Sequence, residues 1–388
     1  GAPWNPLKFD PNGVRETYGK MFLTLWNCYR FHADYAALDG FDPEINNSPI
    51  ETRSELDRWI LSRATSVAKK YHNQFVNWDF HKACRDLEDF VINDLSNWFL
   101  RRSRRRLWDD TASEDKRSCQ HTLHEILTLV CKLTAPVAPF MADEIYSNLM
   151  GSSVHLANWP IQEEGALPPQ DLDLEAKMDL VRSLAETGRR IRVKAKRRQR
   201  LPCNEGWIVG GPDLNVFHEI LAEELNVETI STVEDLDKFQ KIELSPNRKM
   251  LGKKCRQDLP AVLELLENAD PDNILLEIEA EICILEGYDI TMEDIELRRV
   301  EKENFAAATI SIEEIGDVSL VLDMSLNEKL ISKGLARDII RHVQAKRKEL
   351  NLDVEALIEL NVWIDSREQL FDNDWSHIQI ETRAGRAE

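Results

Sequence analysis

Apolar residues recur at helical spacing through five consecutive segments between Pro11 and Leu149, with glycine or proline between the first and second segments and between the fourth and fifth. In the first segment Tyr18, Phe22 and Leu25 fall on one stripe of a helix. No segment of this region alternates apolar and polar residues as a strand does. Five successive helices can bury their apolar stripes against one another, so the pattern predicts an all-α helical bundle.

Capping and helix-stopping residues indicate where these helices begin and end. Ser54 suits the N-cap of the second helix, because Glu55 and Asp57 follow in its first turn. The predicted helices cover Pro11 to about Leu38, Ser54 to about Phe75, Asp79–Trp108, Glu114–Leu133 and Pro139–Leu149.

The pattern changes beyond Gly151. A proline-containing loop over His155–Pro169 precedes one long predicted helix, from Leu172 to about Val193. After Pro202, short β-like stretches alternate with helical windows, which predicts a mixed α/β or α+β domain. The predicted strands are Gly206–Val209, Val227–Ser231, Lys241–Leu244, Leu275–Leu285, Ile295–Val300, Val318–Leu322 and Leu357–Ile364. The predicted helical windows are Asp213–Leu225, Gln257–Glu267 and Leu326–Leu350.

We therefore expect a multidomain chain with three parts: a helical bundle over residues 1–151, a loop and long connecting helix over 152–200, and an α/β domain over 201–388. With 388 residues, 43% of them hydrophobic and 30% charged, the chain can bury a sizeable core. It has no apolar run of membrane-spanning length and no signal or transit pattern, so we expect a cytoplasmic protein. Because it starts without methionine, we also expect a part of a longer protein.

The cysteines exclude two kinds of small scaffold. There are seven, an odd number, and none forms a Cys-x-x-Cys pair, which argues against a disulfide framework and a structural zinc site. We expect reduced, mostly buried thiols. Cys119, His121 and His124 are close in sequence, but a fourth ligand is missing, so we predict an ordinary helix surface without metal.

Positive charge is concentrated in two runs, although the formal net charge is −20. The first run spans Arg101–Arg106 and the second spans Arg189–Arg200. Without the thirteen cations of these runs, 36 Lys and Arg remain against 69 Asp and Glu. A polyanion is therefore expected to bind at the two runs and to be repelled elsewhere.

The first run lies towards the end of the predicted helix Asp79–Trp108. A guanidinium group can donate two hydrogen bonds to one phosphate, so we predict that the first run contacts phosphates. The first candidates for contact are Arg101, Arg102, Arg104, Arg105 and Arg106. The alternative is a solvated face that complements the negative end of the helix dipole. Trp98 and Trp108 would offer stacking surfaces for bases, but the spacing favours the core for both.

The second run ends a predicted helix and enters a loop closed by Pro202. Two interpretations fit this run: its cations contact successive phosphates of a nucleic acid, or they form a charged linker that stays hydrated. The candidates for contact here are Arg190, Arg192, Lys194, Lys196, Arg197 and Arg198.

No self-contained active site is predicted. Gly206–Pro212 places two glycines after a predicted strand, but it has neither a dinucleotide nor a Walker pattern, so it predicts a simple strand-to-helix turn. The chain also lacks a Gly-x-Ser-x-Gly elbow and a His-Glu-x-x-His motif.

Several segments together resemble the C-terminal region of isoleucyl-tRNA synthetase. In the first half these are Pro3–Asp10, Tyr18–Ala36, Ser54–Arg63, Asn93–Trp108 and Leu133–Tyr146. Valyl- and leucyl-tRNA synthetases share the motifs of the helical bundle. Pro246–Gly252 and Gly334–Gln344 favour the isoleucine enzyme, and the later part is most similar to the archaeal and eukaryotic cytosolic type.

The resemblance implies a class Ia anticodon-binding bundle followed by a C-terminal extension. It implies that the anticodon arm of tRNA(Ile) is the partner, and that ATP and Mg²⁺ serve the full-length enzyme but not this chain. The family's His-x-Gly-His motif, Lys-Met-Ser-Lys-Ser loop, editing domain and bacterial zinc-binding cysteine cluster are missing here. We therefore expect the chain alone to be inactive, to have no metal, and to depend on catalytic and editing domains outside it.

Two alternatives stay open at this stage. One is the equivalent part of valyl-tRNA synthetase. The other is a non-enzymatic acidic helical scaffold, whose bundle and α/β module dock other synthetases or a chaperone. Protein partners bound through the C-terminal domain are also open for the synthetase fragment itself.

Overall fold

The computed structural model of the chain describes residues 9–387, except 46–47, 109–110, 112, 163–164, 271–272, 275, 278–283, 286, 314, 354–355 and 364–369. The chain forms two compact units, residues 1–179 and 180–388. The boundary falls inside one long helix, α8 (Leu172–Lys194), which the sequence predicted as a connecting segment. Pro3–Asp10, one of the segments that carry the family resemblance, lies mostly outside the described residues.

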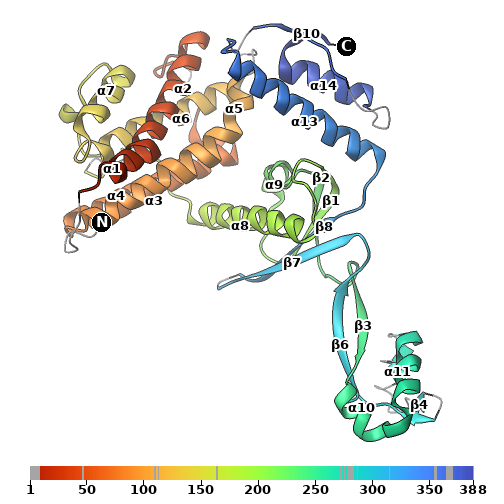
Figure 1. The fold of residues 1–388 in the computed structure, drawn as a ribbon. Helices are drawn as coiled ribbons and strands as arrows, with labels where there is room; N and C mark the ends of the chain where they lie inside the picture. The colour runs from red at the N-terminus through yellow and green to blue at the C-terminus, as the bar shows by residue number, and fades with distance from the viewer. Residues whose placement is uncertain are drawn as a thin grey trace. The chain divides into compact units, whose positions relative to one another are not determined.

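The first unit is helical, as predicted (Figure 1). Its long helical segments begin and end within two residues of the predicted limits. In chain order they are α1 (Pro11–Thr17), a π-helical turn (Tyr18–Phe22), α2 (Leu23–Asp39), α3 (Glu55–Val76), α4 (Phe80–Asp89), a π-helical segment (Phe90–Leu100), α5 (Arg101–Trp108), α6 (Glu114–Thr134) and α7 (Pro139–Met150). Short 3₁₀ turns occupy Ile50–Thr52 and Val154–Leu156.

Local chemistry explains the helix ends. Ser54 caps α3, since its Oγ accepts a hydrogen bond from the backbone N–H of Asp57 at 3.3 Å. Ser113 caps α6 in the same way, through the N–H of Lys116 at 3.1 Å. Gly40 follows α2 with φ 61°, a left-handed conformation that glycine adopts without strain. The caps therefore fix where α3 and α6 begin, and packing of fully buried residues such as Trp59 and Phe90 holds the unit together.

Cys119, His121 and His124 are buried, so the prediction of an ordinary helix surface was wrong. The reason is that α6 packs against α2, α3, α5 and α7, which leaves these three side chains at most 8% exposed. The His124 ring lies 5.7 Å from the ring of His32, centroid to centroid. Within the part of the chain that the structure describes, no group of three or more His, Cys, Asp or Glu residues is arranged to hold a metal ion.

Burial of His32 predicts a pH dependence of stability. Burial, and then His124 and His121, lower the pKa of His32 to about 3. The unfolded chain, with a pKa of about 6.5, therefore binds this proton first, and stability is lost as the pH falls below about 6.5. From about pH 7 to about pH 5 we expect His32 to reduce the free energy of unfolding by about 2 kcal/mol. Urea unfolding across this range should show a smaller loss in His32→Leu, and equal losses in both proteins would contradict the assignment.

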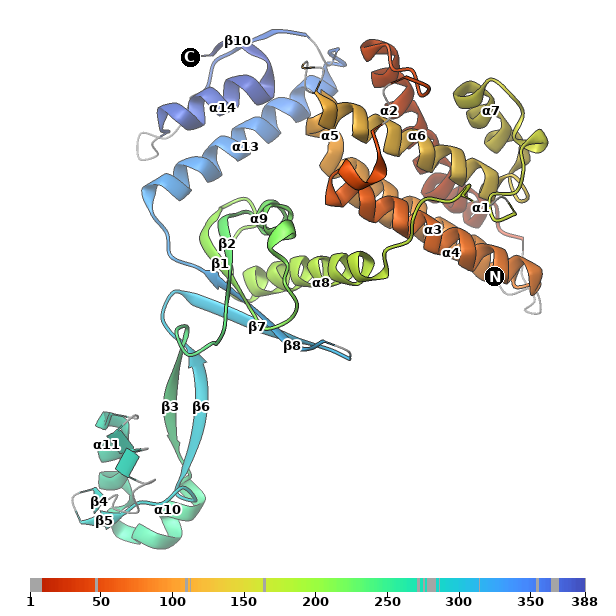
Figure 2. The ribbon, with the colours of Figure 1, turned by 180° about the vertical axis from the view of Figure 1, so that it is seen from behind.

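The second unit contains a four-stranded mixed sheet in the order β2-β1-β8-β7 (Figures 1 and 2). Its strands are β1 (Cys203–Val209), β2 (Val227–Val233), β7 (Phe305–Ile312) and β8 (Gly316–Asp323). β1 pairs with β2 in parallel, and a 3₁₀ turn (Asn215–Phe217) with α9 (His218–Leu225) connects the two strands. β1 and β7 both pair with β8 antiparallel. The predicted mixed α/β character is thereby confirmed, although β7 was not foreseen.

The two glycines after β1 make a tight turn, as the sequence predicted. Gly210 and Gly211 have φ 78° and 82°. A Cβ at Gly210 would lie only 2.8 Å from the carbonyl oxygen of Asp317, so a side chain has no room there.

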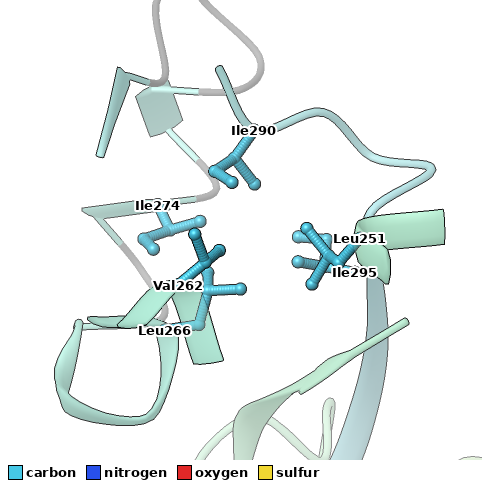
Figure 3. Packing of buried hydrophobic residues seen from close by; sticks show 6 residues of the cluster. All are labelled: Leu251, Val262, Leu266, Ile274, Ile290 and Ile295. Atoms are coloured by element: carbon cyan, nitrogen blue, oxygen red, sulfur yellow. The ribbon is translucent and has the colours of Figure 1, made fainter. Parts of the chain in front are cut away.

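A two-stranded ribbon of β3 (Gln240–Pro246) and β6 (Ile295–Glu301) emerges from this unit. The segment between the two strands contains α10 (Arg248–Cys255), a 3₁₀ turn (Arg256–Asp258), α11 (Leu259–Asn268), β4 (Ile284–Leu285) and β5 (Tyr288–Asp289). Residues of α10, α11 and β6, with Ile274 and Ile290 between these elements, form a small apolar core (Figure 3): Leu251, Val262, Leu266, Ile274, Ile290 and Ile295. The strand predicted over Leu275–Leu285 lies largely outside the described residues, and Leu276 is helical.

The chain closes with α13 (Glu328–Glu349), β9 (Ile358–Leu360), α14 (Asp372–Thr382) and β10 (Ala384–Ala387). Ala336, Ile339 and Ile378 form the core between α13 and α14. β9 is shorter than predicted, and Ile364 lies outside the described residues. None of the helices in the described ranges is both long and apolar enough to cross a bilayer.

Candidate nucleic-acid interface

Helix α5 presents one face to solvent, formed by Arg101, Arg104, Arg105 and Trp108. We call these four residues the α5 face. They are spaced three, four and seven residues along an α-helix, so their side chains share one side of it. All four are exposed, whereas Ser103 and Leu107 on the other side are buried. Three guanidinium groups and an indole ring are therefore displayed together.

Trp108 is exposed, which differs from the position in the core that the sequence predicted. Both tryptophans of this region were expected in the core, and Trp98 is indeed only 5% exposed. Trp108 is 43% exposed, because it occupies the last position of α5, on the solvent side of the helix. An exposed indole beside arginines can stack on an unpaired base.

Arg106 points away from the α5 face and anchors α5 to its neighbours. Its guanidinium donates to Asp57 Oδ1 at 3.0 Å, to Asp57 Oδ2 at 2.7 Å and to Asp115 Oδ1 at 2.7 Å. Burial by itself would lower the pKa of Arg106, but the hydrogen bonds that it donates to Asp57 and Asp115, together with their negative charge, raise it overall. The side chain is only 18% exposed. The structure therefore assigns Arg106 to holding α5 in place, not to phosphate contact.

Arg102 is half-buried and lies over the ring of Trp98, with its Cζ 4.7 Å from the ring centroid. This is cation–π geometry. The indole N–H of Trp98 in turn approaches the sulfur of Met178 at 3.3 Å. Arg102 thus connects the α5 region to the core and is a weaker candidate for contact than the α5 face.

The arginines of the α5 face differ in the contacts that they make within the protein. Arg104 makes no hydrogen bond or ion pair with any residue that the structure describes. Arg101 donates from Nε to the carbonyl oxygen of Asn97 at 2.9 Å, which fixes the side chain without changing its charge. Like charges three and four residues apart on a helix repel one another. A bound polyanion would relieve that repulsion.

The second basic run, like the first, contains both exposed cations and buried or half-buried arginines that hold the structure. Arg192 is fully buried, and its guanidinium donates to the carbonyl oxygens of Leu201, Leu225 and Asn226 at 2.8, 2.6 and 2.8 Å. Burial lowers its pKa. The prediction of Arg192 as a phosphate contact is therefore wrong: the residue ties the end of α8 to the loops around β1 and β2.

The other members of the second run differ in exposure. Arg197 is half-buried and donates to the carbonyl of Ser325 at 3.2 Å. Arg190 is exposed and donates to Thr187 Oγ1 at 2.8 Å. Lys194, Lys196 and Arg198 are exposed and remain candidates.

Replacing Arg192 by methionine should separate its structural role from RNA binding. Three buried or partly buried carbonyls would lose a charged donor, so we expect the second unit to lose about 2–3 kcal/mol of stability. The salt dependence of RNA affinity should stay as in the wild type under conditions where the variant is folded. Urea unfolding and RNA titration measure the two effects, and a lower salt slope in the folded variant would contradict this assignment.

Sequence reasoning missed the two carboxylates that pair with Arg106 of α5. Asp57 is fully buried in the first turn of α3, and Asp115 lies in the first turn of α6. The capping pattern Ser54-x-x-Asp57 was visible in the sequence, but Arg106, the partner of Asp57, is 49 positions away. Such a long-range pair leaves no periodic signal.

Exposed arginines beside an exposed indole, as on the α5 face, are a combination found on RNA-binding surfaces. Residues 57–205 match the family described as the anticodon-binding domain of tRNA ligase, and this range contains the whole α5 face. The chain therefore carries an anticodon-binding domain of this class.

Three relatives narrow the class further. Isoleucine–tRNA ligase 2 of Bacillus thuringiensis subsp. konkukian (strain 97-27) is 33% identical over 388 residues, covering 98% of this chain and 36% of the relative. Isoleucine–tRNA ligase of Clostridium novyi (strain NT) is 33% identical over 371 residues, covering 92% and 35%. That of Cytophaga hutchinsonii is 32% identical over 377 residues, covering 93% and 33%.

The chain is homologous to the C-terminal part of isoleucine–tRNA ligases, which are class I aminoacyl-tRNA synthetases. It spans about a third of the length of these relatives. This result supports the isoleucine resemblance over the valine equivalent and over an unrelated acidic scaffold.

Proposed function

We propose that this chain binds the anticodon arm of tRNA(Ile) and holds it for aminoacylation in the cytoplasm. ATP and Mg²⁺ would act in a catalytic domain that this chain does not contain, and an editing domain would likewise lie outside it. The observation that carries the proposal is the α5 face: three exposed arginines and an exposed tryptophan on one helix, inside the matched anticodon-binding domain. Phosphates would meet the guanidinium groups, and an unpaired base would meet the indole.

We also propose the archaeal and eukaryotic cytosolic type of C-terminal extension. The support is the resemblance of Pro246–Gly252 and Gly334–Gln344 to that type. The three relatives named above are bacterial, so their similarity does not distinguish between the types.

Salt dependence tests the proposed function. If the α5 face neutralises phosphates, each contact releases condensed counterions, and log affinity falls by about 0.7–0.9 per contact for each unit of log salt concentration. We therefore expect the affinity of the chain for tRNA(Ile) to fall linearly on this scale. A scaffold that binds only other proteins would show no affinity for tRNA, and that outcome would reject the proposal.

A further inference from the structure

The segment Arg248–Arg256 carries a second exposed basic surface, which the proposed function does not use. Arg248, Lys249, Lys253 and Arg256 are all exposed, and we call these four residues the α10 patch. None of them makes a hydrogen bond or an ion pair with a residue that the structure describes. No acidic residue lies between Pro246 and Gln257, although the chain as a whole has a net charge of −20.

The underside of α10 is fixed to the small core at the end of the ribbon (Figure 3). Leu251 is fully buried there and packs with residues of α11 and β6. Asn247 caps the helix, since its Oδ1 accepts from the N–H of Met250 at 3.3 Å. Lys254, which is not part of the patch, donates to Asp294 Oδ2 at 2.8 Å. These contacts hold the helix so that the patch faces solvent.

The stability of α10 accounts for Lys253, which lies in the last turn at the negative end of the helix dipole, but not for the cations at the start of the helix. Arg248 and Lys249 stand in the first turn, at the positive end of the helix dipole, and no acidic residue accompanies them. Cations there are unfavourable. Lys249 and Lys253 are also four residues apart, a spacing at which like charges repel. Both effects disfavour the helix, and a bound polyanion would remove both.

The surface around the patch indicates the kind of partner. Protein–protein interfaces normally contain an apolar centre. Within the segment from Ser245 to Asp258 no large apolar side chain is exposed; the exposed large apolar residues of the surrounding described elements are the single side chains Leu276 and Met292. Binding to a phosphate backbone needs concentrated cations and no apolar centre. The charge and composition of the patch therefore fit a nucleic acid better than an acidic protein.

We infer that the α10 patch binds the phosphate backbone of tRNA, as a contact additional to the α5 face. This inference rests on the proposed function, because it assigns a second surface to the same ligand. The motif Pro246–Gly252 then has a physical role: proline ends β3, Asn247 caps the helix, Leu251 anchors it, and the cations beside them bind phosphate.

The test compares tRNA(Ile) binding by the full chain and by Lys249→Gln/Lys253→Gln over a range of salt concentrations. Glutamine has nearly the same helix propensity as lysine, so α10 should be retained. Each lost contact should lower affinity about fivefold at about 0.1 M salt and reduce the salt slope by about 0.7. The matched control is Arg298→Gln/Arg299→Gln on β6, which removes two exposed charges that already pair with Glu296 and Asp237. We expect the control to bind as the wild type does.

The outcomes separate this inference from the proposed function. If the wild type does not bind tRNA, both fail. If the wild type binds and an α5-face variant is weakened, but the α10 variant keeps wild-type affinity and slope, the inference alone is overturned and an acidic protein becomes the better partner. A loss equal to that of the control would likewise reject a specific contact. Lys253→Gln alone, expected to lose one contact, decides the matter if circular dichroism shows that the double variant is unfolded.

Discussion

Replacing Asp57 by alanine is expected to destabilise the helical unit by about 3 kcal/mol, the lower end of the range for a broken buried ion pair. Asp57 is fully buried and accepts hydrogen bonds from Arg106 at 2.7 and 3.0 Å and from Ser54 Oγ at 2.9 Å. Without it, Asp115, which is 56% exposed, is the one acidic partner that the mostly buried guanidinium of Arg106 keeps among the described residues. Urea denaturation measures the loss.

Two comparisons show whether the uncompensated charge causes this loss. Asp34→Ala removes an exposed carboxylate, 61% accessible, that pairs with Arg30, and it should change stability by less than about 0.5 kcal/mol. Adding Arg106→Met to Asp57→Ala should recover part of the stability, because no unpaired charge would then be buried. If Asp57→Ala were as stable as the wild type, Asp57 would not anchor α5.

The largest expected effect on binding comes from replacing Arg101, Arg104 and Arg105 together by alanine. Each phosphate contact is worth about fivefold in affinity at about 0.1 M salt, so the loss of three contacts should weaken tRNA binding about 100-fold. The salt slope should fall by about 2. Thermal stability should change little, because the three side chains are exposed.

A control with the same change in charge distinguishes contact from general attraction. Lys20, Arg30 and Lys82 are exposed cations of the helical unit, each paired with a carboxylate of its own helix or cap. Replacing these three by alanine should leave the salt slope near the wild-type value. If the two triple variants bound tRNA equally well, the α5 face would not be the interface.

Helices of the first unit were predictable because their signals are local. The 3.6-residue periodicity, the Ser54 cap and the Asp39-Gly40 stop all act within a few residues of one another. The strand β7 was missed because its half-buried sequence Phe305–Ile312 includes three consecutive alanines, which have little preference for strands.

The roles of the arginines were only partly predictable, because their partners are distant in sequence. Nothing near Arg106 in the chain indicates that it meets Asp57, and nothing near Arg192 indicates that it meets the carbonyls of Leu225 and Asn226. The sequence found the two basic runs and their concentration of charge. Only the folded structure separates arginines that hold the protein together from those that face solvent.

The most direct measurement of the central claim is competition against labelled tRNA(Ile) by two RNA hairpins of similar length and charge, at about 0.1 M salt. One hairpin copies the anticodon arm and the other copies the acceptor arm. If the α5 face holds the anticodon arm, the anticodon hairpin should compete at least about tenfold better, since stacking of one unpaired base contributes about 1–3 kcal/mol. Equal competition by the two hairpins would contradict the account, because it would show attraction to phosphate without recognition of the anticodon arm.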